Sequence, residues 1–105
     1  MGLKNPLLIR WAEPAERDLD SLLTYIAFEN PDVASKLFYK VMGAIEHAAA
    51  FPKLARYIPE LGHTYRELLN VRPFRIIYRI ADNELRIIGV MRMEQDFNPE
   101  RFIDN

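Results

Sequence analysis

The sequence predicts an α+β domain of the order β-α-α-β-β-β, in which an antiparallel helical hairpin packs on a mostly antiparallel sheet. Three observations predict this class: a short apolar stretch near the start, two long segments with apolar residues at helical spacing, and alternating apolar segments after Pro52. The 105 residues are 50% hydrophobic and include no cysteine. We therefore expect one domain over residues 1–105 with a single core, without disulfides and without thiolate chemistry.

The first strand is predicted at Leu7–Trp11, where the residues are apolar and suited to a β-strand. Pro14 stands at the first position of a helix, and Glu16 lies in its first turn, where the helix dipole favours an acid. The apolar residues that follow at helical spacing are Ala15, Leu19, Leu22, Leu23 and Ile26. We expect this first helix to end near Glu29.

A second helix is predicted directly after the first. Asn30, Pro31 and Asp32 are an N-cap, a first-position proline and an acid in the first turn. Its apolar stripe consists of Ala34, Leu37, Phe38, Val41, Ile45 and Ala48. The helix is expected to stop before Phe51-Pro52. Because so few residues separate the two helices, they must form a hairpin.

After a loop at Lys53–Gly62, the sequence predicts strands at Thr64–Leu69, Phe74–Ile80 and Leu85–Met91, the last two joined by a tight turn at 81–84. If residue 80 lies opposite residue 85, alternate residues share a face. The expected core face, covered by the helices, is Phe74, Ile76, Tyr78, Ile80, Leu85, Ile87, Gly89 and Met91. The expected opposite face is Arg75, Ile77, Arg79, Arg86, Ile88, Val90 and Arg92.

This opposite face is rich in arginine. Arg79 lies directly opposite Arg86 in the expected register, and opposed like charges destabilise a sheet. Local acids such as Glu84, carboxylates of a partner protein or a phosphate backbone are candidates to offset them. The residues expected to contact a target or an anion are Arg66, Arg75, Arg79, Arg86 and Arg92.

The net charge of −1 conceals an uneven distribution. Fourteen basic and fifteen acidic residues argue at first against an anionic partner, because nucleic-acid binders usually carry a large positive excess. Residues 53–92, however, hold eight basic and four acidic residues, whereas residues 1–52 and 93–105 are each net acidic. The sheet region is therefore basic and suited to an anionic partner.

The chain resembles the RelE/ParE superfamily of toxins from bacterial type II toxin–antitoxin systems, from about Ile9 to about Phe97. The segments that carry the resemblance are Trp11–Leu19, Phe51-Pro52, Arg66–Leu68 and Phe74–Ile80. The resemblance implies the fold described above and a cognate antitoxin that wraps the toxin with an acidic segment. It also implies one of two targets: RelE-like members cleave messenger RNA on the ribosome, and ParE-like members poison DNA gyrase without nuclease activity.

The residues near the end of the last strand favour the ParE-like branch. Nuclease members commonly place a histidine or tyrosine there as a catalytic group, whereas this chain has Arg92 and Phe97. Arginine is no ordinary base, because its pKa lies above ~12. We therefore expect a binder of gyrase rather than an enzyme. The endonuclease alternative stays open, with Glu67 or Glu94 as base.

The cationic residues of such an endonuclease would be Arg66, Arg75, Arg79 and Arg92. The two histidines are expected to be structural, His47 on the surface of the second helix and His63 in a turn. Glu94 and Asp96 lack a third ligand, so no metal site and no cofactor are expected.

The expected partners are the antitoxin and gyrase, or in the alternative the ribosome with its messenger RNA. A toxin that only binds its antitoxin is the third possibility. The antitoxin would lie on the basic sheet face or along the helical hairpin, against Tyr25, Phe28 or Tyr39 if these are exposed. The chain is expected to be a homodimer or part of a toxin–antitoxin hetero-oligomer. Without a signal peptide or a membrane span, we expect a cytoplasmic protein.

Overall fold

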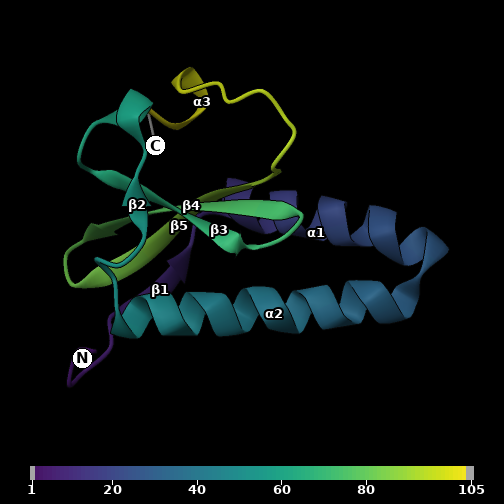
Figure 1. Cartoon of the computed structure of the whole chain (residues 1–105), viewed down its shortest axis with the longest axis horizontal. Helices are drawn as coiled ribbons and strands as arrows, with labels where there is room; N and C mark the ends of the chain where they lie inside the picture. The colour runs from purple at the N-terminus through teal and green to yellow at the C-terminus, as the bar shows by residue number, and fades with distance from the viewer. Residues whose placement is uncertain (1, 104–105) are drawn as a thin grey trace.

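The computed structural model describes residues 2–103 as a five-stranded sheet with a helical hairpin on one face and the C-terminal segment on the other (Figure 1). The elements are β1 (Leu8–Trp11), α1 (Glu13–Glu29), α2 (Pro31–Ala50), β2 (Arg56–Tyr57), the short 3-10 helix η1 (Pro59–Leu61), β3 (Tyr65–Val71), β4 (Phe74–Ala81), β5 (Glu84–Arg92) and α3 (Glu100–Ile103). The predicted α+β class and element order are confirmed. The structure adds β2, η1 and α3.

The hairpin of α1 and α2 turns on a single residue. Asn30 donates its backbone N–H to the carbonyl of Ile26 at 2.9 Å, which ends α1, and its side-chain Oδ1 accepts from the N–H of Val33 at 3.2 Å, which begins α2. One asparagine thus caps both helices. The predicted start signal for the second helix is confirmed, and the hairpin brings two amphipathic helices onto the same face of the sheet.

The strand order is β1-β5-β4-β3-β2, with β1 parallel to β5 and the other pairs antiparallel. The β4–β5 turn is made by Asp82 and Asn83, both with positive φ (52° and 61°), as a two-residue hairpin turn requires. The parallel pairing sets Arg10 beside Arg86 and Trp11 beside Ile87. It therefore ties the start of the chain to its last long strand.

A β-bulge in β5 changes the predicted register. Tyr78 pairs with Ile87 as expected, but the next residue of β4, Ile77, pairs with Gly89, so that Ile88 is one extra residue. Beyond the bulge the alternation is inverted. The prediction that Gly89 and Met91 face the helices, and that Val90 and Arg92 face away from them, is therefore wrong.

Two apolar clusters lie on opposite sides of the sheet. The larger one, beneath the helices, includes Val41, Ile45, Phe74, Ile76, Tyr78, Leu85, Ile87 and Val90. The smaller one consists of Ile58, Ile77, Ile88, Met91 and Phe102. It was not expected from the sequence, since the sheet face that it occupies was predicted to be open. We call this sheet face, which also carries Glu67, Arg75, Arg79 and Arg86, the far face.

The C-terminal segment, residues 98–103, covers part of the far face. Phe102 is buried and stacks on Phe97 with ring centres 5.6 Å apart. Its backbone carbonyl accepts from the hydroxyl of Tyr65 at 3.3 Å. A Cβ atom on Gly89 would lie 2.5 Å from the Phe102 ring, so the glycine leaves room for the phenylalanine. Arg101 also pairs with Asp18 of α1.

Raising the pH should destabilise the fold through Tyr78, whose buried hydroxyl donates to the carbonyl of Pro52 at 2.8 Å. Burial raises the pKa of Tyr78 to about 12, and the nearby charge of Arg66 opposes this rise. Between about pH 10 and pH 12 the folded protein keeps the tyrosine proton, whereas the unfolded chain, in which the tyrosine pKa is ~10, loses it. Stability is therefore complete below about pH 10 and falls by ~2–3 kcal/mol as the pH rises to about 12. Urea denaturation across this range measures it.

Tyr78→Phe should remove the loss of stability that Tyr78 causes between about pH 10 and pH 12. At neutral pH the variant should be less stable by about 1 kcal/mol, because the hydrogen bond to Pro52 is lost. Tyr39→Phe, at an exposed site of α2, is the matched control and should leave the pH profile unchanged. Identical alkaline profiles for Tyr78→Phe and the unmodified protein would contradict the assignment.

Candidate functional site

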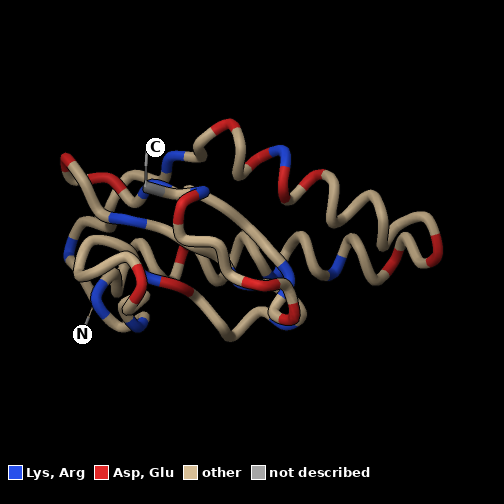
Figure 2. Tube along the Cα trace, turned by 90° about the horizontal axis from the view of Figure 1, so that it is seen from above, with Lys and Arg blue, Asp and Glu red and all other residues tan. Residues whose placement is uncertain are grey.

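The five arginines expected to form one site lie on both faces of the sheet. Arg75, Arg79 and Arg86 belong to the far face, whereas Arg66 pairs with Tyr78 and Arg92 pairs with Phe74, both of which face the helices. The prediction that Arg92 shares a face with Arg75, Arg79 and Arg86 is therefore wrong, and Arg66, for which no face was predicted, also lies on the helix face. Basic and acidic positions are mixed over the sheet end of the molecule, and the tip of the helical hairpin is acidic (Figure 2).

Glu67 binds Arg75 and Arg56 in a charge cluster on the far face. Its carboxylate is 1% exposed; one oxygen accepts from Nη2 and Nε of Arg75 at 2.6 and 3.1 Å, and the other accepts from Nε of Arg56 at 2.8 Å. The Arg75 guanidinium also lies 5.1 Å from the ring centre of Phe97. The single carboxylate offsets one of the two guanidinium charges. Because Glu67 and Arg75 bind each other, neither is free to act as a base or a cation.

Arg66 and Arg92 stabilise local structure on the helix face. Arg66 donates to the carbonyl oxygens of Lys53 and Ala55, and its guanidinium lies 4.0 Å from the ring centre of Tyr57. It thereby holds the loop before β2 against β3. Arg92 lies 5.0 Å from the ring centre of Tyr25 in α1 and forms a long ion pair of 3.7 Å with Glu94.

A row of arginines crosses three neighbouring strands on the far face. The ladder places Arg10 of β1 beside Arg86 of β5, and Arg86 beside Arg79 of β4. The opposed pair Arg79–Arg86 was predicted from the sequence. Arg10 was missed, since only the parallel β1–β5 pairing brings it there. No local signal in the sequence indicates that pairing.

Two acids neutralise part of this row. Glu84 accepts from Nε of Arg10 and from Nε of Arg86, both at 2.9 Å, and Asp82 accepts from Nη2 of Arg86 at 3.0 Å. The hydrogen bonds from Arg10 and then from Arg86 lower the pKa of Glu84, and the bond to Glu84 raises the pKa of Arg86. Glu84 is thus the local acid that the sequence suggested as an offset.

Arg79 is different from its neighbours. No carboxylate within residues 2–103 pairs with it, and its Nε atom is buried without a hydrogen-bond acceptor. The side chain lines a surface hollow of about 420 Å³ together with Arg10, Trp11, Ala12, Glu84, Arg86 and Ile88. The hollow lies at the junction of β1 with the start of α1.

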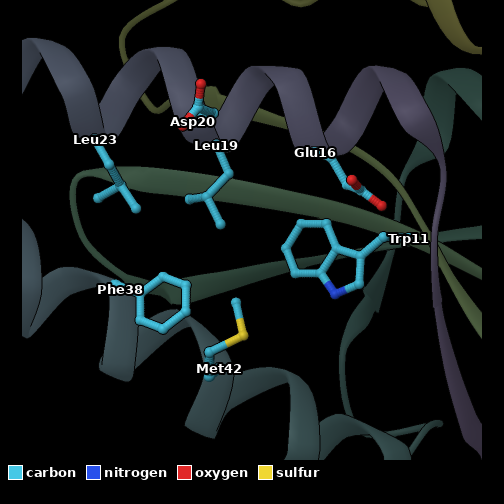
Figure 3. Close-up of a pocket in the computed structure, with 7 residues that line it drawn as sticks. All are labelled: Trp11, Glu16, Leu19, Asp20, Leu23, Phe38 and Met42. Carbon is cyan, nitrogen blue, oxygen red and sulfur yellow. The ribbon is translucent and has the colours of Figure 1, made fainter.

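A second hollow, of about 340 Å³, lies between the helices. Its mostly apolar lining consists of Trp11, Glu16, Leu19, Asp20, Leu23, Phe38 and Met42, drawn as sticks in Figure 3. The side chains of α1 and α2 point toward one another across it, and the indole of Trp11 lies at one end (Figure 3). Farther along the hairpin, Tyr25, Phe28 and Tyr39 are largely exposed. The helical hairpin therefore presents a largely apolar surface.

The histidines lie apart from the arginine row. His47 of α2 stacks on Phe51 with ring centres 4.7 Å apart, and His63 lies edge-on to Tyr57 at 5.0 Å. Within the described residues 2–103, no three histidine or acidic side chains are arranged to hold a metal ion, and no helix is long and apolar enough to cross a membrane.

Comparison with known proteins identifies the family. The model of the family described as "ParE toxin of type II toxin-antitoxin system, parDE" matches residues 9–97, from β1 to Phe97 at the far-face cluster. The chain is 32% identical over 90 residues to a curated protein of Sinorhizobium fredii named "Putative toxin Y4kP", covering 85% of this chain and 91% of that protein.

Solved structures share the fold. The chromosomal ParDE TA system from P. aeruginosa is similar with a TM-score of 0.71 at 21% identity, covering 84% of this chain and 97% of that chain. The toxin-antitoxin complex RelBE2 from Mycobacterium tuberculosis is similar with a TM-score of 0.61 at 15% identity, covering 90% of this chain and all of that chain. The family model matches nearly the whole sheet and hairpin, and the curated relative matches most of the chain. This protein therefore belongs to the ParE toxin family of type II toxin–antitoxin systems, within the RelE/ParE superfamily.

Proposed function

We propose that the protein arrests growth by binding DNA gyrase in the cytoplasm and is neutralised by a cognate antitoxin. Membership of the ParE toxin family supports this proposal. The observation that favours it over an RNA-cleaving activity is the separation of the arginines: Arg66 and Arg92 lie on the helix face, and Arg75 and Arg79 on the far face. One phosphate group cannot contact all four across the sheet.

The candidate bases support the same choice. Glu67 is buried, and two arginines already donate hydrogen bonds to both oxygens of its carboxylate. Glu94 is exposed and lies beside Arg92 on the helix face, away from Arg79. General-base catalysis needs a group within hydrogen-bond reach of the 2′-hydroxyl and a cation at the phosphate on the same side. A binding mechanism makes no such demand.

The helical hairpin is the surface that we propose for the antitoxin. Its hollow between α1 and α2 and the exposed rings of Tyr25, Phe28 and Tyr39 suit the apolar side of an amphipathic helix. Phe28, at the tip of the hairpin, is 92% exposed. An exposed patch of large apolar side chains marks a surface that binds another molecule.

Gyrase and the ribosome should be compared as targets with the same purified protein. With gyrase, ATP and plasmid, we expect supercoiling to be inhibited and cleaved DNA to accumulate. With ribosomes and messenger RNA, we expect no cleavage. Expression alone should arrest growth, and coexpression with the cognate antitoxin should restore it. Gel electrophoresis of the DNA and RNA, and colony counts, are the measurements.

Variants separate the alternatives. Ribosome-dependent RNA cleavage that is lost in Arg75→Ala or Arg79→Ala but kept in Lys40→Ala, a charge change at an exposed site of α2, would establish an endonuclease and overturn the proposal. Absence of growth arrest together with tight antitoxin binding would instead identify a protein that only binds its antitoxin.

A further inference from the structure

Arg79 is the member of the arginine row for which the described residues supply no carboxylate partner. Arg10 and Arg86 both donate to Glu84, and Arg86 also donates to Asp82, whereas Arg79 has no acceptor for its buried Nε within the described residues. Buried donors in native proteins almost always have a partner, and an exception calls for a specific explanation. The Nε atom itself is shielded from solvent, so an acceptor from another molecule would bind the part of Arg79 that lines the hollow.

The charges around Arg79 leave room for one further anion. The groups that face it across the sheet are Arg86 from β5, and beyond it Arg10 from β1, with the carboxylates of Glu84 and Asp82 at the turn. Three guanidinium groups and two carboxylates give a surplus of one positive charge. A single carboxylate would complete the balance and relieve the like-charge contact between Arg79 and Arg86.

The hollow beside Arg79 has walls of two kinds. Arg79, Arg10 and Arg86 supply donors, and Trp11, Ala12 and Ile88 supply apolar surface. Ala12 is also the N-cap of α1 and has no side-chain cap, so the positive end of the helix dipole adjoins the hollow. Leu8, 67% exposed, lies two residues before Arg10 on β1. An acidic side chain flanked by apolar ones matches this surface.

We propose that this hollow, at the junction of β1, β4 and β5, binds one carboxylate of an acidic peptide through Arg79. A continuous phosphate backbone fits less well, because Asp82 at the rim is 84% exposed and would repel a polyanion. The inference rests on the proposed function in one respect only, namely that the antitoxin is the source of the acidic peptide. The binding itself is a property of the toxin alone.

A titration with a synthetic peptide tests the proposal independently of gyrase and of the antitoxin. The probe is a capped tetrapeptide of alternating leucine and glutamate that carries a fluorescent dye, and the signal is the fluorescence anisotropy of the dye. We expect saturable binding that weakens about tenfold or more in Arg79→Gln, because a charge-assisted hydrogen bond is lost. Lys40→Gln, which removes a charge from exposed α2, should bind as the unmodified protein does.

Arg79→Gln removes a like-charge contact, so it should fold. A second readout nevertheless uses the unmodified protein: the Arg79 Nε–H signal in nitrogen-15 NMR spectra should shift on peptide addition. Equal binding by Arg79→Gln, an unmoved Nε–H signal, or Arg79-dependent binding of a thymidine oligonucleotide in place of the peptide would overturn the proposal. A gyrase assay that fails while the peptide binds would reject the proposed target and leave this site standing.

Discussion

Replacing Glu67 with alanine is expected to lower the free energy of unfolding by about 3 kcal/mol. The carboxylate is 1% exposed and holds Arg75, whose side chain is only 16% exposed. Without Glu67, the Arg75 guanidinium stays buried among the residues of the far face with no counter-charge. The Arg56 pair adds little, because the Arg56 side chain is 61% exposed and water screens its charge.

Urea denaturation followed by circular dichroism measures this effect. Glu46→Ala, at an exposed site of α2, is the matched control and should change stability by less than about 0.5 kcal/mol. In the double variant that also replaces Arg75 with alanine, much of the loss should be recovered, because no unpaired buried charge remains. Equal stabilities of the Glu67→Ala and Glu46→Ala proteins would show that the cluster does not stabilise the fold.

Phe102→Ala is expected to release the C-terminal segment from the sheet. A buried phenylalanine replaced with alanine costs ~3–5 kcal/mol in a closed core. Because the segment is terminal, the stability lost is limited to the free energy with which residues 98–103 dock on the sheet. The strands β1–β5 should stay folded. The newly exposed side chains of Ile77, Ile88 and Met91 should then bind a hydrophobic dye or promote self-association.

Gly89→Ala should have the same effect from the opposite side of the contact, because its Cβ would lie 2.5 Å from the Phe102 ring. Hydrogen exchange and limited proteolysis of the segment are the measurements, with Phe28→Ala at the exposed hairpin tip as control. Protection of the segment equal to that of the unmodified protein in both variants would contradict the expected docking. Global unfolding of both would show that the segment belongs to the main cooperative unit.

Local signals made much of the fold predictable from the sequence. Pro14 and the Asn30-Pro31-Asp32 run determine where the helices begin, and Asp82-Asn83 suits the positive φ angles of the β4–β5 turn. Between the β4–β5 turn and the Tyr78–Ile87 pair, the predicted register of the two strands is confirmed. The bulge at Ile88 was not predicted, because the alternation of apolar residues continues through it. The contact of Gly89 with Phe102, at the distant end of the chain, was likewise absent from any local signal.

The site was less predictable than the fold for the same reason. Which arginines are neutralised depends on neighbours in space: Glu67 reaches Arg75 through the β3–β4 pairing, and Glu84 reaches Arg10 only through the parallel β1–β5 pairing. In the sequence all the sheet arginines look alike. The structure distinguishes Arg79, for which residues 2–103 supply no carboxylate partner, from Arg75 and Arg86, which have theirs.

The parallel pairing of β1 with β5 also affects how the molecule is made. Residues 8–11 pair with residues 84–87, so the first strand has no ladder partner until most of the chain has been synthesised. Non-local pairings of this kind slow folding, whereas the α1–α2 hairpin is local and can form early. The arginine row spans β1, β5 and β4 and therefore cannot come together before residues 84–87 have been made. During translation, a nascent toxin presents its helical hairpin before its hollow at Arg79 exists.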